Sequence, residues 1–230
     1  MSAFEFPDPV SHHFAEWARF GDYYYAARDI VSFGAPLTVR NLREAYLKGI
    51  FPWHIDRLPL PWFCPEQRAI IEFSQLNVPR SLAKERRKEQ FTFTINRDFE
   101  AVIRACSSVS RSDGHGTWIT RDFIRVYSEL HREGMAHSVE ARDQNGKLVG
   151  GLYGIDAGGV FCGESMFHHA SNASKLSLLF LIDQLQERGS TWLDIEVMTP
   201  HMKALGAIEI SRADFLDKLR STQELGLEIF

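Results

Sequence analysis

Three acidic residues stand in stretches whose pattern predicts buried β-strands. Glu164 lies in VFCGESMF, residues 160–167, among small and apolar neighbours. A core strand does not need an acid at such a position, so this residue is a candidate for chemistry. Asp194 and Glu196 lie two residues apart in TWLDIEV, residues 191–197, and on a regular strand both would project from the same face.

The chemistry of these acids depends on whether they are buried. If Asp194 and Glu196 share a buried face, their carboxyl groups repel each other and raise the pKa of at least one of them. Together with Glu164 they would form an acidic cluster able to bind or deprotonate an amine. The alternative is a solvent-exposed face with no such role, and the residues alone leave both interpretations open.

Other catalytic patterns are missing from the sequence. The histidines are scattered, without HExxH or a ligand-spaced Cys/His cluster, so we expect no metal site. Ser165 lies in Gly163-Glu164-Ser165-Met166, which is not the GxSxG pattern of a serine hydrolase. The sequence also lacks a Walker loop and a GxGxxG motif, so no nucleotide cofactor is expected.

The strands that carry these acids are predicted to belong to one α+β unit. Turn signals at Asn145-Gly146 and Gly158-Gly159 separate three apolar runs, which predicts a three-stranded antiparallel meander from residue 136 onward. After it we expect a helix at about 173–188, a strand at 191–197, a short helix or loop, a last strand (AIEIS) and a helix at 212–219.

The first half of the chain is predicted to add further elements. Helical spacing marks 38–48, 122–134 and the stretch after Asp98, and strands are expected at 69–73 and 91–95. Residues 1–35 are rich in aromatic residues, and we expect a helix that packs them on the body. The proline-rich segment 49–65 suits neither a regular helix nor a central strand. We place a domain boundary there, with a small N-terminal domain at 1–65 and a larger one at 66–230.

Tryptophans and a basic run raise the question of a nucleic-acid ligand. Trp53 and Trp62 lie in the proline-rich segment, where they suit stacking on a base or a ligand ring, although burial between the domains is the simpler interpretation. The net charge is −4, so a cluster of positive charge at 80–88 is concentrated enough to suit phosphates, although a basic run is usually a solvated helix face. The cluster consists of Arg80, Lys84, Arg86, Arg87 and Lys88.

Length and composition limit the number of domains and the cellular compartment that we expect. With 230 residues, 44% of them hydrophobic, the chain is long enough for one large domain or one large and one small. Three cysteines without CxxC spacing argue against a disulfide framework and fit a reducing compartment. No secretory signal is recognisable, and no window approaches the roughly 18 apolar residues of a membrane helix. We therefore expect a cytoplasmic protein without a membrane partner.

An ordered set of motifs makes the sequence similar to a known family. Between about residues 38 and 219 the chain contains, in this order, GIFPW, GTWI, HSVE, LVGGLYG, GESMF, NASK and LGAIEISR. These resemble the motifs of the leucyl/phenylalanyl-tRNA–protein transferases, and GESMF followed by NASK is a highly specific pair. The resemblance does not clearly cover the first 35 residues.

The resemblance implies a function and a fold. Such enzymes move leucine or phenylalanine, with methionine as a further candidate, from the 3′ end of an aminoacyl-tRNA to the N-terminal amine of a protein that begins with Arg or Lys. The transfer marks the acceptor for degradation by the N-end rule. The family's large domain is similar to the N-acetyltransferase fold, with a mainly antiparallel sheet flanked by helices. An aminoacyl ester is already activated, so no cofactor is implied, and we expect a monomer.

The resemblance also implies roles for individual residues. Glu164, Asp194 and Glu196 would be catalytic, and Trp53 and Trp118 would stack on the terminal adenosine. The basic cluster at 80–88 would lie on the path of the tRNA. The pocket for the donor side chain would be lined by Leu152, Ser165, Met166, Leu178, Leu181 and Leu185.

The sequence departs from the family pattern at Asp194-Ile195-Glu196, where the family typically has Asp-Cys-Gln. The glutamine has been assigned a role in a hydrogen-bond relay with the aspartate. An amide donates and accepts hydrogen bonds, whereas an ionised carboxylate only accepts them. Glu196 would act as a base for the acceptor amine, pair with a basic acceptor residue, or mark altered activity. The alternatives are a relative with other donors or acceptors, and a non-catalytic protein that binds aminoacyl-tRNA or N-terminal residues.

Overall fold

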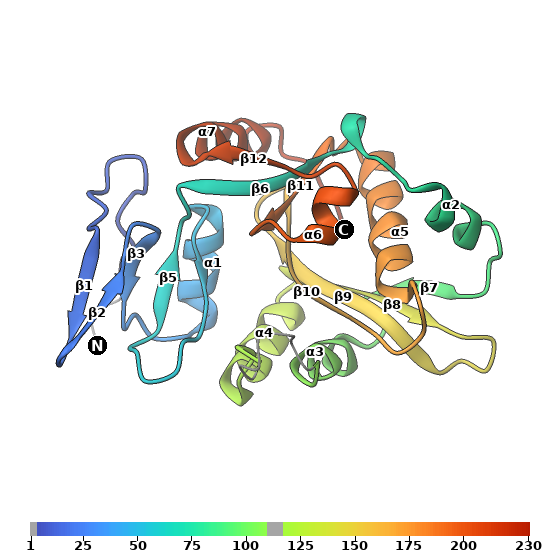
Figure 1. The fold of residues 1–230 in the computed structure, drawn as a ribbon, viewed down its shortest axis with the longest axis horizontal. Coiled ribbons are helices and arrows are strands. Elements are labelled where there is room, and N and C mark those ends of the chain that lie inside the picture. Colours follow the sequence, from blue (N-terminus) through green and yellow to red (C-terminus); the bar gives the residue numbers. More distant parts are fainter. Residues whose placement is uncertain (1–3, 110–116) are drawn as a thin grey trace.

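The computed structural model of the protein describes residues 4–109 and 117–230. Most of the predicted loop SSVSRSDGHG, residues 107–116, and the first residue of the GTWI motif lie outside the described residues. The described part is an α+β structure, as the sequence predicts, with its larger sheet on one side and a smaller β-rich part on the other (Figure 1).

A seven-stranded sheet forms the centre of the larger part. Its order is β12-β6-β11-β10-β9-β8-β7, and β10 and β11 are its one parallel pair among the described strands. The prediction of a mainly antiparallel sheet is therefore confirmed. The strands are β6 (Gln67–Glu72), β7 (Thr92–Ile95), β8 (Ala136–Arg142), β9 (Leu148–Asp156), β10 (Phe161–His168), β11 (Trp192–Glu196) and β12 (Ile208–Ser211).

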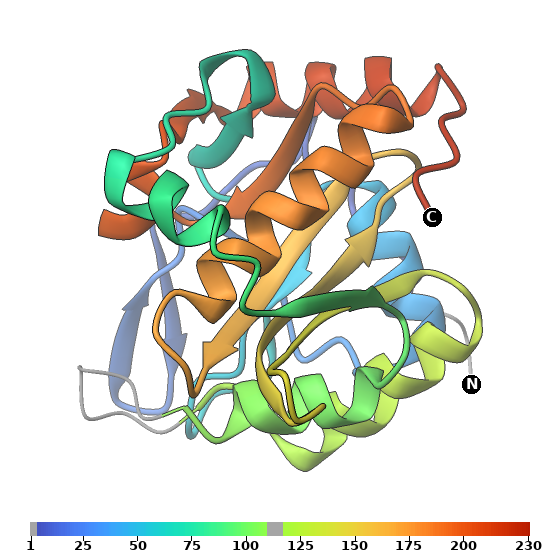
Figure 2. The same ribbon diagram turned by 90° about the vertical axis from the view of Figure 1, so that its right-hand side faces the viewer.

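Helices cover both faces of this sheet. The long helix α5 runs diagonally across the strands on one face, whereas α3 and α4 pack on the other (Figure 2). At the edge, α7 packs on β6 and β12. The bounds are α2 (Arg80–Arg86), α3 (Phe99–Ser107), α4 (Arg121–Arg132), α5 (Ala173–Glu187), α6 (Pro200–Ala204) and α7 (Arg212–Gln223), with a 3₁₀ turn η1 (Phe73–Gln75) after β6.

Local sequence signals explain where these elements begin and end. The hydroxyls of Thr120, Thr199 and Ser211 cap the N-termini of α4, α6 and α7 by accepting backbone N–H groups of the first turn. The meander β8–β9–β10 is confirmed, and the glycines of its two turns adopt positive φ values, for example 77° at Gly146 and 80° at Gly158.

The N-terminal part corrects one prediction. Residues 17–33 form strands instead of a helix: β1 (Trp17–Phe20) pairs with β2 (Tyr23–Ala26), and β3 (Ile30–Phe33) joins a separate sheet of order β3-β5-β4. The two-residue turn Gly21-Asp22 explains the hairpin, because φ is 62° at Gly21 and glycine adopts this angle easily. Trp17 and Tyr23 are 61% and 70% exposed, whereas the ring of Phe20 lies 4.8 Å from that of Phe33 in β3, so only part of the aromatic run packs on the rest of the protein.

The proline-rich segment forms the rest of the small sheet. Strands β4 (Phe51–Pro52) and β5 (Pro61–Phe63) flank its loop, and helix α1 (Val39–Leu47) precedes it, capped by the Thr38 hydroxyl at 3.2 Å from the Asn41 N–H. Trp62 is fully buried, which confirms the core interpretation for this tryptophan. Its neighbour Phe6 and residues of the larger part belong to one hydrophobic core. The boundary near residue 65 stays a prediction.

Candidate active site

A cavity of about 290 Å³, called here the main cavity because predicted acids line it, lies where β10 and β11 separate. These parallel strands pair at one point, Cys162 opposite Asp194. Two residues beyond that point stand Glu164 on β10 and Glu196 on β11, and both side chains line the cavity. Of the three acids predicted to form one cluster, the structure therefore brings Glu164 and Glu196 together at this cavity.

A β-bulge directs Glu164 into the cavity. Gly163 pairs with Gly154 and Ser165 pairs with Tyr153, so Glu164 is the extra residue of β10 in its ladder with β9. The Tyr46 hydroxyl donates to one oxygen of the Glu164 carboxylate, and the Tyr127 hydroxyl lies 3.3 Å from the other. The two hydroxyls are 2.6 Å apart, and both rings are buried, so the carboxyl group of this half-buried side chain is held in place from behind.

A second irregularity positions Glu196. The register of β11 against β6 shifts between Asp194 and Glu196, and the Val197 N–H bonds the Ile195 carbonyl at 2.6 Å, which closes a three-residue turn around Glu196. The φ of Glu196 is 61°, an angle that costs energy for a residue with a side chain and that marks functional sites in many proteins.

The turn corrects the prediction that Asp194 and Glu196 project from one face. Glu196 joins Leu193 and Ile195 in the cavity wall, whereas Asp194 faces away from the cavity toward Arg68. Both acids are buried, at 0% and 4% exposure, so the solvent-exposed alternative is wrong.

Asp194 forms a buried ion pair with Arg68. The guanidinium donates to both carboxylate oxygens, from Nε at 2.9 Å and from Nη2 at 2.6 Å, and its carbon lies over the rings of Phe51 and Phe215 at 4.6 and 4.5 Å. The same carboxylate accepts the Glu196 backbone N–H at 2.9 Å. Asp194 thus ties Arg68 to the Glu196 turn without lining the cavity, which makes it a positioning residue in this geometry.

The two cavity acids hold protons more strongly than ordinary carboxyl groups. Burial raises the pKa of Glu164 to about 7, although the tyrosine hydroxyls lower it. Burial raises the pKa of Glu196 still further above its usual range, and the charge of Glu164 adds to this effect. The Oε1 atom of Glu196 is buried without a hydrogen-bond partner among the described residues. Of the two acids, Glu196 therefore holds its proton more strongly, and Glu164 is the one that ionises nearer to neutral pH.

Apolar side chains form the wall beside the acids. Leu152, Met166 and Leu178 line the cavity as predicted, with Ser165 among its polar groups. Leu181 and Leu185 do not line it, which corrects the prediction. They are fully buried in the core cluster beneath α5, because they lie on later turns of the helix than Leu178.

The predicted stacking tryptophans lie together at the cavity rim. The rings of Trp53 and Trp118 are 5.5 Å apart with an angle of 33° between their planes, and both line the cavity. Trp118 is only 5% exposed and packs edge-on against Phe123. The more exposed Trp53 therefore provides most of the indole surface that a ligand ring can reach.

Several residues of the site were not predicted. Tyr46 and Tyr127 lie at helical apolar spacing, which indicates core packing, and the role of Arg68 depends on a partner 126 positions away. Thr199 and His201 also line the cavity, with Thr199 Oγ1 at 3.2 Å from His201 Nδ1. Burial lowers the pKa of His201, so the neutral imidazole is favoured.

The basic cluster forms α2 and the residues after it, away from the cavity lining. All five side chains lie in exposed residues. Arg86 pairs with Asp183, and Lys88 pairs with Glu85 at 2.7 Å, whereas Arg80, Lys84 and Arg87 have no ion pair within the described residues. These three basic side chains are the ones available to an anionic ligand.

The described residues hold no group of three or more His, Cys, Asp or Glu side chains that would bind a metal ion. Cys64, Cys106 and Cys162 are free and buried. None of the described helices combines the length and the apolarity needed to cross a membrane.

Comparison with known proteins matches most of the chain. The family model "Leucyl/phenylalanyl-tRNA protein transferase" matches residues 70–220, and the model of the N-terminal domain of these proteins matches residues 35–66. One solved structure, of L-PGS from Bacillus licheniformis, has a TM-score of 0.40 at 14% identity over 59% of this chain and 47% of its own, and we infer nothing from it.

Relatives named leucyl/phenylalanyl-tRNA–protein transferase are much more similar. The protein of Pseudoalteromonas atlantica is 46% identical over 83% of this chain and 81% of its own. The protein of Shewanella sediminis is 42% identical over 89% and 87%, and that of Pseudomonas putida is 45% identical over 83% of each chain. The match of both family models and the identity to these relatives show that this chain belongs to the leucyl/phenylalanyl-tRNA–protein transferase family.

Proposed function

We propose that the protein is an enzyme that transfers leucine or phenylalanine from aminoacyl-tRNA to the N-terminal amine of proteins that begin with Arg or Lys. The observation that carries this proposal is the main cavity, which combines an apolar wall, the acids Glu164 and Glu196 and an indole pair in a chain of this family. Methionine is a further donor that an apolar pocket would accept. Marking the acceptor for N-end-rule degradation is part of the same proposal.

The donor side chain would occupy the apolar wall. Leu152, Met166 and Leu178 offer a surface without charge, which favours leucyl and phenylalanyl groups over polar aminoacyl groups. The adenine of the terminal adenosine would stack on Trp53, with Trp118 supporting that ring from its other side. In this arrangement the ester bond would lie between the indoles and the two acids.

The acids would then supply the proton transfers. The acceptor amine, as its free base, attacks the ester carbonyl, a C–N bond forms and the ester C–O bond breaks. Glu164, negatively charged and poised near neutral pH, takes a proton from the nitrogen. Glu196, held protonated, would donate a hydrogen bond to the departing ribose oxygen and keep its proton. Glu164 would then pass the proton that it took from the nitrogen to that oxygen, so both acids return to their starting states and the products are an amide and a ribose hydroxyl.

The protonated state of Glu196 would resolve the departure from the family motif. A neutral carboxyl group donates and accepts hydrogen bonds, as a glutamine amide does. Its unpartnered Oε1 atom lies in the cavity wall, within the part of the chain that the structure describes. Glu196 would therefore take the place of the amide without a loss of activity.

Transfer of labelled phenylalanine or leucine from tRNA to a peptide beginning with Arg or Lys tests the proposal. We expect a labelled peptide, no requirement for ATP, and faster transfer than from a tRNA charged with a polar amino acid. Protein that binds Phe-tRNA but labels no peptide would instead be a non-catalytic aminoacyl-tRNA binder. Labelling that does not depend on an N-terminal Arg or Lys would indicate a relative with other acceptors.

A further inference from the structure

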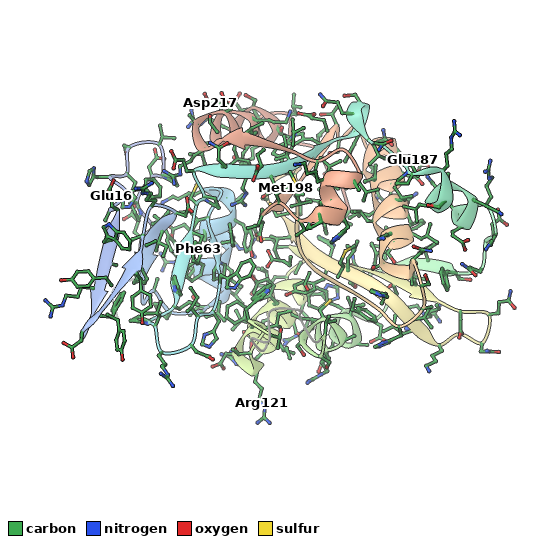
Figure 3. The ribbon with its side chains drawn as sticks, in the orientation of Figure 1. Glu16, Phe63, Arg121, Glu187, Met198 and Asp217 are labelled. Atoms are coloured by element: carbon green, nitrogen blue, oxygen red, sulfur yellow. The ribbon has the colours of Figure 1, made fainter. Side chains whose placement is uncertain are left out.

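A second cavity, of about 340 Å³, shares the residues Trp53 and Val197 with the main cavity. The chain itself connects them, because Glu196 and Val197 line the main cavity while Val197 and Met198 line the second. Phe63 of β5 and Met198, both labelled in Figure 3, belong to opposite parts of the molecule and both line it. A ligand that spans this shared wall reaches from the second cavity to the reacting ester.

The second cavity is acidic. Asp29 and Glu209 line it, and no Arg, Lys or His is among its described lining residues. Glu209 lies in the exposed edge strand β12 and has no ion pair within the described residues. Asp29 accepts the Glu66 N–H at 2.7 Å and lies 3.5 Å from Arg212, so its charge is partly neutralised. Glu209 is therefore the main source of negative potential in this cavity.

Aromatic rings form the walls around these acids. Phe51 and Phe63 are stacked with their centroids 5.9 Å apart, and Trp53 completes the side toward the main cavity. Flat rings beside a carboxylate suit a cation with an apolar stem, because the charge meets the acid while the methylene groups contact the rings. Arginine and lysine side chains have this composition, whereas a nucleotide phosphate would be repelled by the acids.

We infer that this second cavity, named here the acceptor cavity, binds the basic side chain of the first residue of the acceptor protein. The inference rests on the proposed function and adds a binding site for the first side chain of the acceptor protein. The side chain and the N-terminal amine share one Cα atom, so a side chain in the acceptor cavity brings the amine to the wall formed by Val197 and Trp53. Beyond that wall lie Glu196 and Glu164. Glu209 is a specificity-determining residue in this arrangement.

Transfer kinetics with matched peptides test the inference. Peptides beginning with arginine and with citrulline differ in charge but hardly in shape, and lysine and norleucine form a second such pair. We expect Glu209→Gln to lower the ratio of kcat/KM for arginine over citrulline about tenfold, the loss typical of a hydrogen bond to a charged group. The effect should be in the acceptor KM, with the KM for Phe-tRNA unchanged. Asp29→Asn should show the same change to a smaller extent.

Controls separate this result from a loss of folding or of activity. Glu187→Gln, on the exposed end of α5 (Figure 3), should leave the ratio unchanged. A Glu209→Gln variant with an unchanged ratio, or with equal losses for arginine and citrulline, would overturn the inference while transfer by the wild type upholds the proposed function. If the wild type transfers nothing, calorimetry with the arginine peptide separates the two ideas. Binding that Glu209→Gln weakens would support the role of the acceptor cavity and reject the proposed transferase activity. No binding would reject both.

Discussion

Four carboxyl groups on strands of the large sheet, three buried and one half-buried, form two contrasting pairs. Glu140 and Asp194 are completely buried and hydrogen-bonded. Glu140 accepts from the hydroxyls of Thr94 and Ser138 at 2.5 and 2.6 Å and from two backbone N–H groups, and Asp194 is held by Arg68 and a backbone N–H. Glu164 and Glu196 border a cavity, and one oxygen of Glu196 has no hydrogen-bond partner among the described residues.

The contrast shows how one sheet uses the same functional group for structure and for chemistry. A carboxylate surrounded by donors is stabilised as an anion and fixes the strands around it. A carboxyl group that borders a cavity has a raised pKa, because burial disfavours its charged form, and stays available to a ligand. The bulges at Glu164 and Glu196 create the second situation on strands that would otherwise bury both side chains in the core.

The largest expected effect is the loss of stability when Asp194, one of the two completely buried and hydrogen-bonded acids, is removed. Asp194→Ala should lower the free energy of unfolding by about 3–5 kcal/mol, because it leaves the Arg68 guanidinium buried without a counter-charge. Denaturant unfolding measures this. The double variant Arg68→Met/Asp194→Leu should lose less free energy of unfolding than the sum of the losses in the single variants Arg68→Met and Asp194→Leu. Additive losses would show that the two side chains are not coupled and would remove the distinction between the pairs.

The next effect is on catalysis. Glu164→Gln removes the base while keeping a group of the same size, so the rate of transfer should fall by roughly 10²-fold. Its thermal stability should be equal to or greater than that of the wild type, because a buried group with a raised pKa no longer has to be ionised. Single-turnover transfer and a thermal melt of the same sample measure both. A variant with full activity would place Glu164 with the structural acids.

The dependence of stability on pH gives a smaller signal with a defined sign. The pKa of Glu164 is about 7 in the folded protein against 4.5 for the free group, so the folded state binds more protons between these values. Stability from this residue is present below pH 4.5 and is lost as the pH rises to about 7. The unfolding free energy of wild type relative to Glu164→Gln should therefore decrease across this range. A flat or rising difference would contradict the raised pKa.

The smallest effect concerns the tRNA path, away from both pairs. Changing Arg80, Lys84 and Arg87 to Gln should weaken tRNA binding and reduce the slope of log K against log salt by about one for each lost phosphate contact. Changing Arg86 and Lys88 should have less effect, because Asp183 and Glu85 already neutralise them. Binding titrations over a range of salt concentrations compare the two variants. Unchanged slopes in both would exclude α2 from the path.

Much of this fold follows from local signals in the sequence. The meander is predictable because Asn145-Gly146 and Gly158-Gly159 are turn dipeptides between apolar runs. The helices are predictable from their capping residues and from the spacing of their apolar residues. The secondary structure of residues 1–35 is less predictable, because an aromatic run has no clear period and only Gly21-Asp22 indicates the hairpin. The site is not predictable from the alternation of residues along a strand. Alternation puts Glu196 on the same face as Asp194, and no residue type marks the register shift that separates the two side chains.

The proposed mechanism requires a proton on Glu196 at neutral pH, and the pH dependence of single-turnover transfer by the wild type, Glu196→Gln and Glu196→Ala shows whether it is there. We predict that Glu196→Gln keeps most of the wild-type rate at neutral pH, because the amide and the neutral carboxyl group offer the same hydrogen bonds. Glu196→Ala should lose about 10²-fold. The wild-type rate should decrease relative to Glu196→Gln as the pH rises through the raised pKa of Glu196. If Glu196→Gln is as slow as Glu196→Ala and the wild type instead gains activity over that range, Glu196 acts as an ionised base and does not carry the proposed proton.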